Sequence, residues 1–309
     1  MPTLQLLVLG ALDVRYDDVP LSKPPTLKAQ SLLAYLVLHR HKPQLRERLA
    51  DLFWGDRPDR KARRSLTTAL SHIRRCLPEK RFLLGDTHTV QLDPQVPCWL
   101  DVDEFEAQAG LDEIAQLQSA VRLYRGDFMD GFYDDWILEE RYRLEVLFAQ
   151  ALGRLMALFE SHGEYEAALA TALRLVEHES WREDAHRVAM RSYGRLGQRG
   201  AALKQYHRCR DLVLRELGAA PTVETQELYQ EILDGRFEIG PAVGGVTVGT
   251  IVAKPAPARG RSPLDLVAPS RLVGREEELA LLRERWKDAK AGHGGLVIIH
   301  GEAGVGKTR

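Results

Sequence analysis

The chain has 309 residues, of which 44% are hydrophobic and 28% charged, and this length is typical of about two globular domains. Such a composition excludes a disordered chain, and no stretch reaches the ~18 consecutive apolar residues of a membrane-spanning helix. The first residues lack the basic segment of a signal peptide, and three widely spaced cysteines exclude a disulfide framework and a CxxC zinc site. We therefore expect a cytoplasmic protein without a metal site or a membrane partner.

The net charge of −1 conceals a large asymmetry along the chain. Residues 1–97 contain 16 Lys and Arg against 10 Asp and Glu, residues 98–238 contain 16 against 27, and residues 239–309 contain 11 against 7. A basic segment joined to an acidic one indicates that only the basic segment meets a polyanion.

Residues 1–97 have the pattern of a small mixed α/β domain. Alternating runs predict strands, helical spacing of apolar residues predicts helices, and Gly, Pro and Asp mark the breaks. The expected elements are strands at 4–9 and 11–16, a helix capped by Thr26, a short helix at 46–54, a longer helix that starts at its N-cap Asp59 and stops before Pro78, and a hairpin formed by 82–84 and 89–92.

Residues 102–233 are almost entirely helical in pattern, and they contain an internal repeat. The segment 162–170 recurs 34 residues later as 196–204, with a glycine at the same place and Ala-Ala-Leu entering the next helix. A helical period of this length resembles a tetratricopeptide repeat, and chance similarity of alanine-rich helices is the alternative. We expect a mainly α chain with a small β component, in which a winged helix precedes this all-α part.

Three further features of the helical part have structural interpretations. Trp136 and Trp181 are expected to pack between helices, and the acidic run at 134–140 is expected to be a solvated face. The arginines of 187–215 alternate with acids, which favours ion pairs over a second DNA-binding face.

The longer helix near Asp59 has two different faces. At about 100° per residue, Leu70, Ile73 and Leu77 fall within about 40° of Leu66 and define a buried stripe. From Arg60 to Leu77 the helix has six Lys and Arg and no acid, which is unfavourable by self-repulsion unless a polyanion lies nearby. The alternatives are a basic helix without a ligand and a nucleic-acid-binding helix, and we favour the second.

A short helix, a turn, a longer basic helix and a hairpin follow one another as in a winged helix-turn-helix of the OmpR type. In that arrangement the last helix enters the major groove and the hairpin reaches the adjacent backbone or minor groove. Arg, Thr and Ser side chains can contact base edges or phosphates there. The residues expected to contact double-stranded DNA are Arg60, Lys61, Arg64, Thr68, Ser71, His72 and Arg75 of the helix, with Thr87 and His88 of the hairpin.

Several segments resemble the SARP family of bacterial antibiotic regulatory proteins. They are 28–36, 49–54 and 63–71 in the first domain, and 102–106, 123–128 and 206–210 in a bacterial transcriptional activation domain. The resemblance covers about residues 4–235 and departs at Leu45, where the family usually has a Ser or Thr cap. It implies an activator that self-associates, binds direct-repeat promoter sites as a homodimer and recruits RNA polymerase, in the regulation of antibiotic biosynthesis and other secondary metabolism.

The last part of the chain contains a phosphate-loop motif. Residues 239–270 are rich in Gly and Pro and are expected to be a flexible linker. In 271–309 a strand-like run precedes Gly301, Gly304, Gly306, Lys307 and Thr308, which match a Walker A loop. Because the motif lies at the end of the chain, we expect only the start of a P-loop ATPase domain, no enzymatic activity, and ATP and Mg²⁺ binding only in a longer parent protein.

Four segments are therefore expected: a winged helix-turn-helix domain at 1–97, an all-helical activation domain at 98–238, the linker at 239–270 and the incomplete ATPase start at 271–309. The leading interpretation is a sequence-specific DNA-binding transcriptional activator. The alternative is the scaffold or sensor portion of a nucleotide-dependent signalling ATPase.

Overall fold

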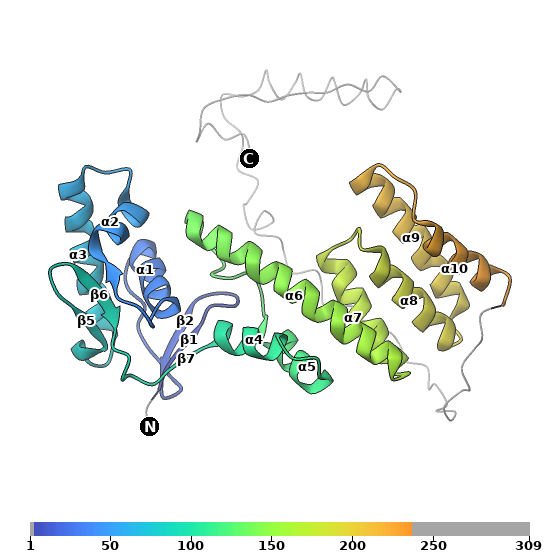
Figure 1. Ribbon diagram of the computed structural model, residues 1–309, viewed down its shortest axis with the longest axis horizontal. Coiled ribbons are helices and arrows are strands. Elements are labelled where there is room, and N and C mark those ends of the chain that lie inside the picture. Colours follow the sequence, from blue (N-terminus) through green and yellow to red (C-terminus); the bar gives the residue numbers. More distant parts are fainter. Residues whose placement is uncertain (1–2, 237–309) are drawn as a thin grey trace, which may run out of the picture. The chain divides into compact units, whose positions relative to one another are not determined.

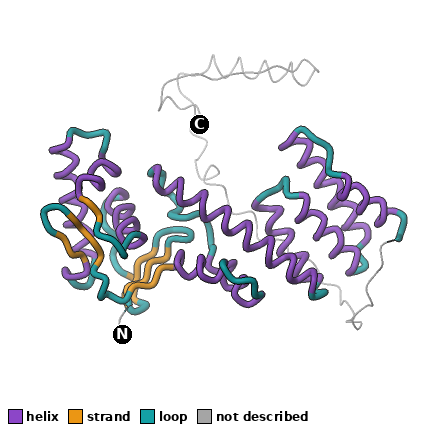
Figure 2. Tube along the Cα trace, viewed as in Figure 1, coloured by secondary structure: helices purple, strands orange, loops and turns teal. Residues whose placement is uncertain are grey.

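The computed structural model describes residues 3–236, which form a mixed α/β part followed by an all-helical part (Figure 1). Strands occur only among the first hundred of these residues, and helices make up most of the rest (Figure 2). The expectation of a mainly α chain with a small β component is confirmed. No helix in this described range is long and apolar enough to cross a lipid bilayer.

A four-stranded sheet contains the first strands and one strand from much later in the sequence. Its members, in spatial order, are β3 (Val19–Pro20), β2 (Asp13–Tyr16), β1 (Leu4–Leu7) and β7 (Cys98–Leu100). β1 runs antiparallel to β2 and parallel to β7, and its alternation buries Leu4 and Leu6. The sequence did not predict β7, because three residues are too few to show alternation. The sheet therefore extends past the boundary expected after residue 97.

Three helices follow the first strands: α1 (Leu27–Leu38), α2 (Arg46–Trp54) and α3 (Asp59–Cys76). α1 begins as expected, because Thr26 Oγ1 accepts a hydrogen bond from the amide of Ala29 at 3.3 Å. The N-cap expected for α3 is wrong by one position, since Pro58 is the N-cap and Asp59 is the first helical residue. In that first turn the Asp59 carboxylate still interacts favourably with the helix dipole.

The expected hairpin is present and forms a wing with one additional short strand. Its elements are β4 (Gln44–Leu45), the short 3₁₀ helix η1 (Lys80–Phe82), β5 (Leu83–Gly85) and β6 (Thr89–Leu92), with strand order β4-β6-β5. Leu45 caps α2 without a side-chain hydrogen bond. Instead, the amide of Arg46 donates to the carbonyl of His88 in the wing at 2.8 Å, so the wing provides a partner for one amide that a Ser or Thr cap could not reach through its own position.

The helical part consists of α4 (Asp101–Ala109), α5 (Ile114–Leu123), α6 (Asp135–Ser161), α7 (Tyr165–His178), α8 (Glu183–Arg195), α9 (Arg199–Leu217) and α10 (Val223–Leu233). The predicted repeat corresponds to two successive helical hairpins, α6–α7 and α8–α9. Gly163 and Gly197 turn the chain at φ values of 75° and 73°, which side chains disfavour. Ala168 and Ala202 are fully buried where the paired helices approach.

A buried junction joins the mixed part to the helical part. The carboxylate of Asp101, at the start of α4, accepts hydrogen bonds from the amides of Val8 at 2.9 Å and Leu9 at 3.0 Å. Trp136 of α6 packs edge-on against Tyr35 of α1, with ring centroids 5.2 Å apart. The packing role expected for Trp136 is therefore confirmed, whereas Trp181 is 46% exposed.

Asp134, directly before α6, also belongs to this junction. Its carboxylate accepts a hydrogen bond from Ser31 Oγ at 2.5 Å and pairs with the Lys28 ammonium at 2.5 Å. Trp136 Nε1 donates to the same Ser31 hydroxyl at 3.2 Å. The solvated acidic face expected for this run is thus wrong at Asp134, because α1 packs against it and leaves its side chain only 17% exposed.

Candidate nucleic-acid interface

The outer face of α3 is where the sequence places most of the expected DNA contacts. Leu66, Ala69, Leu70 and Ile73 are buried along the opposite side, as the helical spacing predicts. Arg60, Lys61, Arg64, Thr68 and Arg75 are exposed, and Ser71 and His72 are partly exposed. The fold therefore aligns these seven side chains along the solvent side of one helix, although nothing in the packing requires them to be basic.

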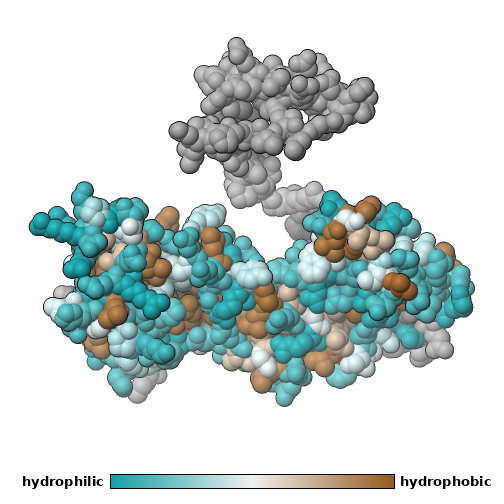
Figure 3. All heavy atoms as spheres, turned by 45° about the horizontal axis from the view of Figure 1, so that its top comes forward, coloured by the Kyte–Doolittle hydropathy of each residue, from teal (hydrophilic) through white to brown (hydrophobic). Residues whose placement is uncertain are grey.

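The cations on this face are largely free of acidic partners. Arg63, at the margin of the face, pairs with Glu47 of α2 at 2.9 Å. Within the described chain, no carboxylate lies within ion-pair distance of Arg60, Lys61 or Arg64. The positive field of the outer face is therefore not neutralised internally, and the surface over α2 and α3 is largely hydrophilic in the view of Figure 3.

The hydroxyl groups of the face are held in defined positions. Thr68 Oγ1 donates to the carbonyl of Arg64 at 3.1 Å, one helical turn earlier. Ser71 Oγ accepts a hydrogen bond from the Arg75 guanidinium at 3.3 Å. Thr68 keeps its acceptor capacity and Arg75 keeps further N–H donors, so both remain able to bind a ligand presented to this side of α3.

The two wing residues expected to contact DNA lie apart from the α3 face. Thr87 and His88 are exposed in the turn between β5 and β6, and in the described chain neither side chain forms a hydrogen bond to α3. The carboxylate of Asp86 closes the turn by accepting hydrogen bonds from the amides of Thr89 at 2.6 Å and His88 at 2.7 Å. These amides, Thr89 first, lower the pKa of Asp86 below its ordinary value, so an anion lies beside the two residues.

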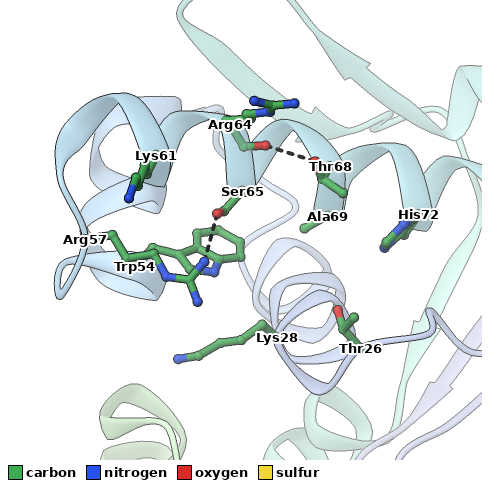
Figure 4. A pocket seen from close by; sticks show the side chains of 10 residues that line it. All are labelled: Thr26, Lys28, Trp54, Arg57, Lys61, Arg64, Ser65, Thr68, Ala69 and His72. Atoms are coloured by element: carbon green, nitrogen blue, oxygen red, sulfur yellow. Dashed lines mark hydrogen bonds between the residues drawn. The ribbon is translucent and has the colours of Figure 1, made fainter.

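A groove of about 480 Å³ runs along one side of α3 (Figure 4). The outer face of α3 contributes Lys61, Arg64 and Thr68, while α1 and the α2–α3 turn contribute Lys28 and Arg57. Sequence reasoning missed Lys28 and Arg57. The only signal for them is a cation in the first turn of α1 and another in the turn before the basic helix, and neither position shows a periodic pattern.

The expected phosphate-loop residues, Gly301 to Thr308, lie outside the described residues. In the described range, no group of three or more His, Cys, Asp or Glu side chains could hold a metal ion.

Comparison with known proteins provides independent information. Residues 101–233 match the bacterial transcriptional activator domain, and residues 271–309 match an AAA ATPase domain. The chain is 26% identical over 274 residues to the transcriptional regulatory protein MoaR1 of Mycobacterium tuberculosis and Mycobacterium bovis, which covers 80% of this chain and 85% of MoaR1. It is 25% identical over 315 residues to the regulatory protein AfsR of Streptomyces griseus, which covers 99% of this chain but 31% of AfsR.

The fold has a counterpart among solved structures. Mycobacterium tuberculosis EmbR, in a complex with a low affinity phosphopeptide, matches with a TM-score of 0.62 at 23% identity, over 78% of this chain and 66% of that chain. Together, the fold and the matched domain define a bacterial regulator in which a winged helix precedes a transcriptional activator domain. The chain is a regulator of the SARP type, as its sequence motifs indicate.

Proposed function

We propose that the protein is a sequence-specific DNA-binding transcriptional activator that reads promoter DNA with the outer face of α3. The observation that carries this proposal is the acid-free row of exposed cations on a helix whose opposite side is buried. The second helix of a helix-turn-helix presents such a face to the major groove. Arginine forks there can bind guanine edges, and Thr or Ser can bind bases or phosphates. The relatives MoaR1 and AfsR, both described as regulatory proteins, support the same role.

The two parts of the chain would divide the work. The winged helix would bind the promoter, with Thr87 and His88 of the wing reaching the neighbouring backbone or minor groove. The helical part, residues 98–238, would associate with a second copy on direct repeats and recruit RNA polymerase, since its excess of acids makes DNA an unfavourable partner. The regulated genes would belong to secondary metabolism, and the protein would act in the cytoplasm.

The direct test is a mobility-shift and footprinting experiment across the promoters next to its own gene. We expect protection of repeated sites and an affinity whose logarithm falls steeply with the logarithm of salt concentration. Sedimentation with a two-site duplex tests self-association, for which two copies per duplex are expected. Equal affinity for promoter and scrambled DNA would contradict sequence-specific binding, and a monomer on the two-site duplex would contradict dimerisation.

A second candidate function is favoured by the match of residues 271–309 to an AAA ATPase domain, with Lys307 and Thr308 in its Walker A sequence. In this alternative, the helical part is the scaffold or sensor of a signalling ATPase that extends beyond this sequence. Calorimetry with ATP and Mg²⁺ distinguishes the two candidates. We expect no ATP hydrolysis by the 309-residue chain and DNA binding that does not respond to ATP. A longer protein that includes the rest of the ATPase domain is expected to bind ATP and to lose this binding in the Lys307→Ala variant.

A further inference from the structure

The groove beside α3 has the chemistry of an anion site. Its lining combines cations and hydroxyl groups and contains no Asp or Glu. The ten residues that line it are Thr26, Lys28, Trp54, Arg57, Lys61, Arg64, Ser65, Thr68, Ala69 and His72. Three structural elements contribute the four cations, as the side chains in Figure 4 show. The arrangement therefore concentrates positive charge around a concave surface and not only along one helix.

Arg57 is oriented without being neutralised. Its guanidinium donates to the Ser65 hydroxyl at 3.2 Å, drawn as a dashed line in Figure 4. No carboxylate of the described residues pairs with it. Trp54, only 5% exposed, packs below and gives the groove an apolar wall. A guanidinium held in this way retains several N–H donors for an incoming oxyanion.

Lys28 connects the groove with the helical part of the protein. Its ammonium is 48% exposed and pairs with the Asp134 carboxylate at 2.5 Å. Asp134 is held in place by the Ser31 hydroxyl, also at 2.5 Å. Among the groove's four cations, Lys28 alone forms an ion pair within the described chain, and the acid comes from outside the winged helix.

We propose that the groove holds one phosphate of the DNA backbone, bound by Lys28 and Arg57, and that Asp134 competes with this phosphate for Lys28. This inference rests on the proposed function, because the groove opens beside Lys61, Arg64 and Thr68 of the outer face. A helix in the major groove lies between two rows of phosphates, so the strand along its α1 side passes this surface. The affinity of the winged helix for DNA is thereby tied to a contact made by the activator domain.

The first experiment measures fluorescence anisotropy of the 309-residue chain with a footprinted duplex and a scrambled duplex. Lys28→Ala and Arg57→Ala are expected to weaken binding about five- to tenfold on both duplexes and to reduce the salt slope by about one. Lys204→Ala and Arg208→Ala change the same charges on exposed positions of α9 and are expected to bind like wild type. Wild-type affinity and salt slope in both groove variants would overturn the proposal.

A duplex series with single neutral methylphosphonates locates the phosphate. One position is expected to weaken wild-type binding by a factor similar to that of Lys28→Ala, and to have little further effect in the variant. Equal sensitivity at every position in both proteins would overturn the assignment. If Lys28→Ala weakens binding of inorganic phosphate or a phosphopeptide but leaves DNA binding unchanged, the groove binds a different anion and the proposal is wrong.

Asp134→Asn tests the competition for Lys28. The amide keeps an acceptor for Ser31 and removes the charge, so DNA binding is expected to tighten about two- to fivefold at low salt. Asp135→Asn, the neighbouring exposed acid without an ion pair in the described chain, is the matched control. The gain is expected to be much smaller in a Lys28→Ala background. A gain of the same size in that background, or none in wild type, would overturn the competition.

The outcomes separate this inference from the function on which it rests. If Arg64→Ala and Arg75→Ala weaken DNA binding while Lys28→Ala and Arg57→Ala do not, only the phosphate groove is wrong. If none of the four variants affects DNA binding, the assignment of α3 as the reading helix also fails.

Discussion

Arginine serves opposite purposes in α3 and in the helices α8 and α9. In α3, Arg60 and Arg64 are exposed and have no acidic partner within the described chain. In α8, Arg191 forms two hydrogen bonds with Glu160 of α6, at 2.6 and 2.9 Å. In α9, Arg199 donates to the carbonyl of Ile232 at the end of α10. The same residue type therefore holds helices together in one region and remains available for a ligand in the other.

This difference teaches that local charge composition is informative only together with its partners. The helical part contains as many Lys and Arg as the first 97 residues, but more than twice as many acids. Its arginines are mostly satisfied by those acids, as the alternating sequence of 187–215 predicts, for example in the pair of Arg210 with Asp211. The function of a basic residue thus follows from whether an acid of the same chain reaches it.

The largest expected effect comes from removing an unpaired arginine of α3. Arg64→Ala or Arg75→Ala is expected to weaken specific DNA binding by about 1–3 kcal/mol, because each side chain can contact a base edge or phosphate. The free energy of unfolding is expected to change by less than about 0.5 kcal/mol, because both positions are exposed. Anisotropy and urea unfolding measure the two quantities. Wild-type affinity in both variants would show that α3 does not read DNA.

A smaller and opposite result is expected for Arg191→Ala. Its guanidinium is 35% exposed and binds Glu160 in a two-bond geometry between α8 and α6, so the loss of stability is expected to be about 1 kcal/mol. DNA affinity is expected to remain unchanged, since the pair lies in the activator domain. Urea unfolding beside anisotropy gives both numbers. A loss of DNA affinity without a loss of stability would contradict the division between pairing and ligand-binding arginines.

The sequence predicted the elements whose patterns extend over several turns. The buried stripe of α3, the cap at Thr26 and the glycine turns of the repeat follow from periodicity and local conformational preference, and the structure confirms them. The pieces that it missed are short or depend on distant partners. β7 has three residues, β4 has two, and each is stabilised by a strand far away in sequence.

The candidate site was predicted to the same extent. The outward position of Lys61, Arg64 and Arg75 follows from helical spacing alone. The groove with Lys28 and Arg57 does not, because three elements form it only when α1 packs against α3. The role of Asp134 was predicted wrongly for a related reason, since an acidic run has no pattern that reveals a helix packing against it from more than a hundred residues away.

The smallest expected effect is a pH dependence confined to the paired region. His186 of α8 is fully buried; its Nε2 donates to the carbonyl of Ser180 at 3.0 Å, and its Nδ1 accepts from the amide of Gln205 at 2.9 Å. Burial lowers the pKa of His186 below its ordinary value of 6.5. The unfolded chain therefore binds the proton more readily than the folded chain, so this contribution to stability is present above about pH 6.5 and is lost as the pH falls toward the lower folded pKa.

We expect the midpoint of thermal unfolding to decrease modestly between pH 7.5 and pH 5.5, with this histidine as a contributor. In the Gln205→Glu variant a carboxylate can accept a hydrogen bond from the protonated Nδ1, so the decrease is expected to shrink or reverse. Thermal unfolding followed by circular dichroism at both pH values measures the difference. An identical pH dependence in wild type and variant would show that the neutral form of His186 does not contribute to stability. The comparison would then be left with arginine pairing as the means by which polar side chains stabilise the helical part.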